Sequence, residues 1–389
     1  MPVRHPLSCF RALSAILVLA ACGDTPTSLE PVVATYPGIT AELAIDPNNL
    51  PNYASVLPAY YDGAVAQLDN TPPNNRITNA GATLGRVLFY DVQLSINNTV
   101  SCASCHDQSI GFTDARRVSP GFAAGLETDA HSMRLANARY YGGTNFFWDR
   151  RAATLEAQTS QPIQSPVEMG FDVANGGLDS LFRKMRGLPY YGELHRLAFG
   201  DTTFSEARIQ FAIAQFVRAM VATTSRWDSG YAANYNPSLP DRGLNTPIAS
   251  FTLQEERGRV LFMRPPPQGG AGCAGCHILP TFSLAANSGS NGLDAGETTT
   301  FKSPSLKSVA LAGPYMHDGR LATLADVIEH YNSGVQNGPA LDNKLRTLGG
   351  APLVLNLSAA DKAALVAFLG TLSDAQLSGD SRFTDPFKP

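Results

Sequence analysis

Two short motifs in this sequence combine two cysteines with a histidine at the same spacing. The first consists of Cys102, Cys105 and His106, and the second of Cys273, Cys276 and His277. C-x-x-C-H is the attachment signature of c-type haem, in which both thiols bond to the porphyrin and the histidine binds the iron. The sequence therefore predicts two covalently bound haem c groups, with His106 and His277 as iron ligands.

Other uses of paired cysteines fit this pattern less well. A zinc ribbon places its cysteine pairs roughly 15–20 residues apart, whereas Cys102 and Cys273 lie 171 positions apart. A thioredoxin-like redox pair requires neither the histidine nor a second copy. The chain has six cysteines, and the other two, Cys9 and Cys22, lie near the N-terminus. No cysteine is therefore left over for a disulfide.

The N-terminal segment has the pattern of an export signal. A positively charged stretch precedes an apolar run over residues 12–21, which is too short to span a bilayer. Small residues then precede Cys22, which resembles the lipobox of bacterial lipoproteins. We predict a lipoprotein signal peptide over residues 1–21, a lipid on Cys22 and a polar tether over residues 22–50. The protein would be periplasmic and lipid-anchored to a bacterial membrane, with a plain signal peptide as the alternative.

The composition excludes one class of partner and suits a two-domain chain. Charged residues make up 16% of the sequence, the net charge is −4, and no cluster of lysine and arginine stands out. We therefore expect no nucleic-acid partner. The 389 residues, 44% of them hydrophobic, are enough for two domains with sizeable cores.

Each haem motif follows the same pentapeptide. Residues 85–89 and 258–262 both read Gly-Arg-Val-Leu-Phe. Helical patterns cover residues 83–90, 205–223, 253–263 and 362–372. This repeat predicts a mainly α fold of two cytochrome c-like domains, each with a haem, facing one another across an interdomain interface. The predicted order is an N-terminal domain over residues 51–229, a linker over 230–250 and a C-terminal domain over 251–380.

Longer stretches carry a resemblance to a known family. Residues 145–158, 162–169 and 312–319 surround Trp148, Glu168 and His317. Together with the two haem motifs, they make the chain similar to the bacterial di-haem cytochrome c peroxidase family, including its MauG-type branch. The resemblance extends from about residue 58 to residue 372. It implies that hydrogen peroxide reacts at the N-terminal haem, and that the C-terminal haem receives electrons or shares oxidising equivalents.

The resemblance assigns roles to three residues near the first haem. Gln158 and Glu168 match the distal-pocket residues that handle peroxide. A carboxylate above the iron can move a proton from one peroxide oxygen to the other, and an amide can hold the peroxide by hydrogen bonds. Trp148 matches an indole between the two haems and would relay electrons. By themselves, Gln158 and Glu168 would pass for surface residues and Trp148 for a core residue.

The sequence departs from the better-known peroxidases at the first haem. These have a dissociable histidine ligand, but residues 118–127, which match that loop, contain no histidine. The nearest is His131, which falls where the family has an asparagine that helps to hold calcium. Either His131 is a displaced haem ligand or the haem has an open site from the start, and we favour the open site. A calcium ion near His131 and the carbonyls of Ala312 and Pro314 remains an expectation of the resemblance.

The second departure concerns the sixth ligand of the C-terminal haem. Tyr331 stands where most of the family has a methionine. MauG-type proteins also have a tyrosine at the matching position. Met316 and His330 are rival ligands, and Met263 is a weaker one. We predict Tyr331, because a phenolate is hard and anionic and stabilises oxidised iron, whereas a thioether favours the reduced form.

These residues predict a di-haem c-type peroxidase that reduces hydrogen peroxide with electrons relayed between two haems. A small electron-donor protein would supply those electrons. The alternative is a MauG-type oxidase that oxidises or modifies a partner protein. A second alternative is a non-catalytic di-haem electron-transfer cytochrome, which would have no use for the pair Gln158 and Glu168.

Overall fold

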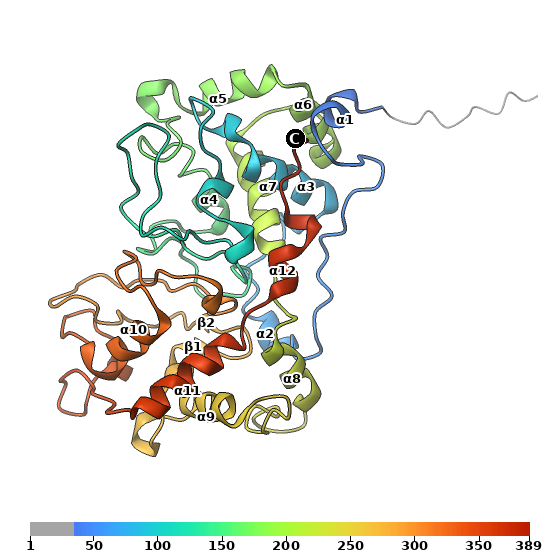
Figure 1. Cartoon of the computed structure of the whole chain (residues 1–389). Helices are drawn as coiled ribbons and strands as arrows, with labels where there is room; N and C mark the ends of the chain where they lie inside the picture. The colour runs from blue at the N-terminus through green and yellow to red at the C-terminus, as the bar shows by residue number, and fades with distance from the viewer. Residues whose placement is uncertain (1–34) are drawn as a thin grey trace, which may run out of the picture. The chain divides into compact units, whose positions relative to one another are not determined.

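The structure is a computed structural model that describes residues 35–389. Its longer helices are α3 (Asn79–Tyr90), α5 (Gly177–Arg186), α6 (Pro189–Phe199), α7 (Glu206–Ala219), α8 (Arg226–Asn234), α9 (Leu253–Met263) and α11 (Ala359–Gly370). Shorter helices are α1 (Pro37–Glu42), α2 (Gly63–Ala66), α4 (Leu155–Thr159), α10 (Leu324–Glu329) and α12 (Ala375–Gly379). Two-residue strands, β1 (His277–Ile278) and β2 (Ser283–Leu284), pair antiparallel. The expectation of a mainly helical fold is confirmed (Figure 1).

The four helices predicted from the sequence are present, with small shifts at their ends. Helix α3 begins four residues earlier than expected because the hydroxyl of Thr78 accepts a hydrogen bond from the backbone of Gly81. Helix α7 starts after Ser205 and ends at Ala219, before the expected residue 223. Helix α9 has the predicted bounds, and Ser358 caps α11.

The repeated pentapeptide marks the same helix crossing in both halves. A Cβ atom at Gly85 would overlap the carbonyl oxygen of Ala212, and one at Gly258 would overlap that of Ala364. Each glycine therefore lets two helix backbones touch, α3 with α7 and α9 with α11. The phenylalanines that end the pentapeptides also pack alike. Phe89 and Phe262 each lie 5.3 Å from a partner ring, Phe216 and Phe368 respectively.

The described residues form two buried hydrophobic clusters. Each cluster combines residues that are far apart in the sequence. The first is built around α3, α6 and α7, and the second around α9, α11 and α8. Leu377 and Phe383, near the C-terminus, belong to the first cluster, and the red segment in Figure 1 returns beside α3 and α7. Conversely, Tyr60 belongs to the second cluster. Both segments thus pack across the domain boundaries expected from the sequence.

The predicted linker and tether are also partly structured. Helix α8 extends into the linker, where Tyr231 and Ile248 are buried in the second cluster. Residues 37–45, expected in the tether, include α1 and bury Ile39 and Leu43 in the first cluster. Burying the apolar side chains of Ile39 and Leu43 lowers the free energy of the folded state, which favours docking of this segment over an extended tether. The expected tether therefore has to end before α1.

The N-terminal predictions fall on undescribed residues. The signal peptide over residues 1–21 and the lipid site Cys22 lie outside residues 35–389. Among the described residues, no helix is long and apolar enough to cross a membrane.

Candidate active site

The first C-x-x-C-H motif is fixed by a tight turn and a histidine hydrogen bond. Cys102–Ser104 form a 3₁₀ turn, and the side chain of Ser104 accepts from the backbone of Ser101. Nδ1 of His106 lies 3.0 Å from the carbonyl oxygen of Phe112. This contact makes Nδ1 the donor and leaves Nε2 free as an acceptor. Burial lowers the pKa of His106, so its imidazole is neutral and suited to bind a metal ion.

The second motif repeats this arrangement with one difference. Cys273–Gly275 form a 3₁₀ turn, and His277 opens β1. The rings of His277 and Phe262 lie 6.4 Å apart, as do those of His106 and Phe89. Burial lowers the pKa of His277 to about 4. However, its buried Nδ1 has no hydrogen-bond partner among the described residues. The four motif cysteines are free thiols.

The predicted residues of the first site line one cavity of about 560 Å³. They are Cys102, Cys105, His106, His131, Trp148, Gln158 and Glu168. The volume falls within the ~300–1,000 Å³ typical of ligand and cofactor sites. The second half also contributes to the wall, through residues 301–305 and His317. A neutral imidazole, two free thiols and a partly open cavity of this size together fit a covalently attached haem.

Two short elements bring Gln158 and Glu168 to this cavity. The hydroxyl of Thr154 caps α4, on which Gln158 sits. The hydroxyl of Ser165 accepts from the backbone of Glu168 at 3.1 Å. Neither functional side chain makes a hydrogen bond or ion pair within residues 35–389. Both groups are therefore available to a ligand in the cavity.

The charge state of Glu168 is set by its surroundings. Burial raises the pKa of its carboxyl group, Arg151 lowers it and Asp129 raises it further. By contrast, Glu156, which lies on α4 with Gln158, is paired with Arg218 and has a lowered pKa. Glu168 is thus a carboxylate that holds a proton more tightly than usual, as a proton-transferring group requires.

Trp148 lies where the two halves meet. Its Nε1 donates to the carbonyl of His131 at 2.7 Å, and its own carbonyl accepts from the backbone of Lys302 at 2.7 Å. Its ring packs edge-on against His317, with centroids 6.5 Å apart. Trp148 therefore contacts the second half directly while lining the first cavity.

The contacts of Trp148 follow a second internal repeat that the sequence analysis missed. Trp148 sits in a hairpin closed by the bridge between Phe146 and Ala152, and His317 in one closed between Tyr315 and Leu321. The two hairpins lie 169 positions apart, and each carries an Asp-x-Arg ion pair. This constant spacing was the available signal. Trp148 and His317 are therefore equivalent positions that pack against each other.

Tyr331 lies beside the second haem motif. Its side chain is half-buried, and desolvation raises the pKa of its phenol; Cys276 and Cys273 are near enough to raise that pKa further. The polar side chain of Asn291 lowers it. Tyr331 is thus brought next to the thiols of the second motif.

The rival ligands contact other groups. Sδ of Met316 accepts from the side chain of Asn291 at 3.2 Å, and Nε2 of His330 lies 3.1 Å from the carbonyl of Asn291. Sδ of Met263 accepts from Arg259 at 3.4 Å. Each of the three rivals thus makes a hydrogen bond within the protein.

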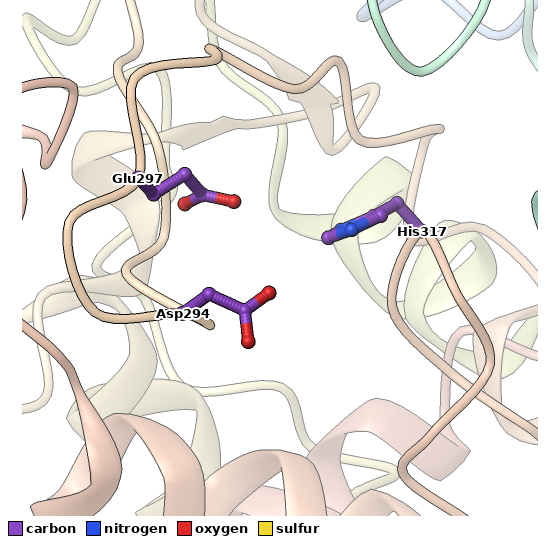
Figure 2. Close-up of side chains that lie close together, drawn as sticks. All are labelled: Asp294, Glu297 and His317. Carbon is purple, nitrogen blue, oxygen red and sulfur yellow. The ribbon is translucent and has the colours of Figure 1, made fainter.

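A further cluster combines His317 with the carboxylates of Asp294 and Glu297. Figure 2 shows the carboxylates of Asp294 and Glu297 pointing toward its ring. The ligand atoms of all three lie within 4.8 Å of one another. Asp294 is already paired with Arg320 at 2.7 Å, and the His317 ring is stacked on Phe301 at 3.8 Å. The cluster therefore has its own protein partners.

The chain is similar to known proteins over most of its length. A family model described as di-haem cytochrome c peroxidase matches residues 79–236. The methylamine utilization protein MauG of Methylorubrum extorquens is 32% identical over 316 residues, 77% of this chain and 80% of that protein. The chain belongs to the di-haem cytochrome c peroxidase family, in its MauG-type branch. It is therefore a haem oxidoreductase, and its family implies two c-type haems.

Other members of the di-haem cytochrome c peroxidase family match over a similar span. The cytochrome c551 peroxidase of Nitrosomonas europaea is 28% identical, over 76% of this chain and 80% of that protein. The crystal structure of a MauG-like protein associated with microbial copper homeostasis matches with a TM-score of 0.68 and 30% identity. It covers 86% of this chain and 99% of that one. The similarity thus includes both halves.

The surroundings of His131 bear on the family's sixth ligand and calcium. Nδ1 of His131 lies 3.1 Å from the carbonyl of Arg116, and Nε2 lies 3.2 Å from the hydroxyl of Thr113. Both ring nitrogens therefore have protein partners. The carbonyl of Ala312, an expected calcium ligand, accepts from the guanidinium of Arg134 at 3.0 Å. A second cation on this oxygen would be repelled, so these residues fit calcium poorly.

Proposed function

We propose that this chain is a di-haem c-type peroxidase that reduces hydrogen peroxide in the cavity lined by His106. The observation that carries the proposal is the free carboxylate of Glu168, in the same cavity as His106 and Gln158. A cytochrome that only transfers electrons gains nothing from an unpaired, half-buried carboxylate beside its haem.

The protein residues supply proton transfer and orientation. A bound haem c supplies the iron at which the O–O bond is broken, while two electrons and two protons convert peroxide into two waters. Oε of Glu168 takes a proton from one peroxide oxygen and returns it to the other, which leaves as water. The Gln158 amide donates a hydrogen bond that holds the peroxide in position.

Electrons would reach the first site through Trp148. This side chain lines the first cavity and packs on His317 of the second half. We place the second haem on Cys273, Cys276 and His277, with Tyr331 as its sixth ligand. A small electron-donor protein would deliver electrons to this haem, and the two halves would form two haem domains facing each other.

A MauG-type oxidase that acts on a partner protein is the second candidate. The position of Tyr331 beside Cys276 favours it, because an anionic ligand would oppose reduction of the second haem by ordinary donors. The identity of 32% to a MauG points the same way. Both candidates share the peroxide chemistry at Glu168 and differ in the source of electrons.

Location and calcium complete the proposal. We infer export to the periplasm and a lipid on Cys22 from the N-terminal sequence pattern and the covalent haem motifs. A calcium ion at Ala312 and Pro314 is left out of the mechanism, because Arg134 already occupies the carbonyl of Ala312.

Stopped-flow absorbance with the purified, fully oxidised holoprotein tests the function. Peroxide should change the haem spectrum, and a reduced small cytochrome c should then be oxidised at two electrons per peroxide. The Cys102→Ala/Cys105→Ala variant should lose the peroxide reaction. If Cys102→Ala/Cys105→Ala reacts like wild type, or wild type does not react, the assignment is wrong.

A further inference from the structure

Lys302 is a buried cation that has no carboxylate partner. Only 4% of its surface is exposed, and it makes no ion pair with any residue in the described range. Its Nζ lies 4.6 Å from the ring centre of Tyr141 and 5.4 Å from that of Phe146. Within residues 35–389, its ammonium group hydrogen-bonds to Sδ of Met133, at 3.9 Å. Aromatic faces and a thioether thus surround this ammonium group.

A second buried lysine shows how the same fold satisfies such a charge. Lys307 is fully buried, and its Nζ contacts the carboxylate of Asp228, which is also fully buried. Like Lys307, Lys302 packs against aromatic rings, but within the described residues it has no carboxylate partner. The nearby guanidinium of Arg150 repels Lys302, and burial lowers the pKa of Lys302 to about 8. The charge of Lys302 is therefore unbalanced within the protein.

The position of Lys302 shows where its counter-ion must come from. Lys302 lines the same cavity as His106 and both thiols of the first motif. The acidic residues of that cavity are Asp129, Asp149 and Glu168, and none of them is paired with Lys302. Asp149 is instead paired with Arg151 at 2.9 Å. The missing anion is thus expected from the occupant of the cavity.

A haem carries two propionate carboxylates, which are the anions of this occupant. We propose that Lys302 binds a propionate carboxylate of the haem attached to Cys102 and Cys105. This assignment rests on the proposed haem in that cavity but not on its reaction with peroxide. Because the backbone of Lys302 also bonds to Trp148, the propionate contact would connect the haem to the segment that holds the relay tryptophan.

Lys302→Met and Lys302→Arg in the holoprotein test the contact. Resonance Raman spectra should show a shifted propionate bending band for one haem in Lys302→Met, and a band near the wild-type position in Lys302→Arg. The reduction potential of the same haem should fall in Lys302→Met, because a cation beside the haem stabilises the reduced form. Lys362→Met, which removes a surface lysine paired with Glu329, should change neither property.

Several outcomes overturn the proposal. A propionate band and potential of wild-type value in Lys302→Met would show that the aromatic rings alone hold the ammonium. Dependence of the Lys302→Met shift on added chloride would assign the site to a small inorganic anion. If Lys302→Met does not fold, a pH titration of the wild-type propionate band tests the contact. A propionate bound to Lys302 should not titrate in the range of ordinary carboxylates, about pH 4–5, and a band that does would overturn the proposal. A pyridine haemochrome count of two haems, measured alongside, separates failure at Lys302 from failure of the proposed function.

Discussion

At the residue scale, the proposed peroxide chemistry rests on a single carboxylate. Glu168 has no protein partner in the described chain, while Glu156, twelve positions earlier, is neutralised by Arg218. Helix α4 thus carries an ion-paired glutamate, and the turn that holds Glu168 carries an unpaired one. The sequence pattern does not distinguish the two; their hydrogen bonds do.

Glu168→Gln should slow the reaction with peroxide by ~10²–10⁴-fold while keeping the spectra of both haems. Stopped-flow absorbance measures this rate. Glu156→Gln is the matched control, and it should lower stability instead, because it leaves Arg218 without its counter-ion. An unchanged rate in Glu168→Gln would remove this residue from the mechanism.

The pH dependence of the reaction should follow Glu168. Burial raises its pKa above the ordinary glutamate value, so the proton-accepting form is lost at a higher pH than for an exposed glutamate. The rate should therefore fall as the pH falls through this raised pKa. A raised carboxyl pKa also means that the charged form costs stability at neutral pH. Thermal unfolding should accordingly show a Tm for Glu168→Gln at or above that of wild type.

Tyr331→Phe should change the spectrum and potential of one haem only. Removing a phenolate ligand would destabilise the oxidised iron, so the potential should rise, and Tyr331→Met should raise it further. Redox titration followed by absorbance measures both. If Tyr331→Phe leaves the second haem unchanged while Met316→Leu or His330→Gln alters it, the ligand is one of these two residues.

At the element scale, Gly85 and Gly258 allow the same close helix crossing in each half. Gly258→Ala should destabilise the protein by about 1–3 kcal/mol, because its new methyl group would push α9 away from the carbonyl of Ala364. Gly370→Ala, at the end of α11, has open space around it and is the control. Urea unfolding followed by far-ultraviolet circular dichroism measures the difference. A neutral Gly258→Ala would show that the crossing can relax.

The sequence predicts local and repeated features well but not the long-range ones. The segments that contain the pentapeptides identified α3 and α9, since apolar residues at helical spacing indicate a helix from the local sequence. Nothing local indicates that Phe383 packs in the first cluster or that Tyr60 packs in the second. The unpaired state of Lys302 likewise depends on neighbours more than a hundred positions away, such as Tyr141.

At the scale of the whole molecule, Arg134 connects the two halves by hydrogen bonds. Its guanidinium donates to the carbonyls of Ile110 and Ala312, and it is 7% exposed. Chelation by EGTA should therefore leave the haem spectra and Tm unchanged. Arg134→Met should lower Tm, since two half-buried carbonyls would lose their donors at up to ~1–3 kcal/mol each. A Tm that falls with EGTA would restore calcium to this interface.

The resting protein should react with peroxide without prior reduction. Both ring nitrogens of His131 already have protein partners, so this histidine should not block the first haem. Stopped-flow spectra of the fully oxidised protein, with and without one added electron, test this. A requirement for that electron, abolished in His131→Gly, would make His131 the dissociable ligand after all.

The return of the C-terminus has a consequence for how the protein is made. Leu377 and Phe383 complete the first hydrophobic cluster, and Leu43 forms a bridge with Phe387. Because the chain emerges from its N-terminus first, this cluster cannot close until residues 377–387 are also present. Until these residues dock, the cluster against which Cys102 packs is incomplete, which would leave the thiols of the first motif accessible to a haem. The late closure gives the cofactor time to enter before the cavity forms around it.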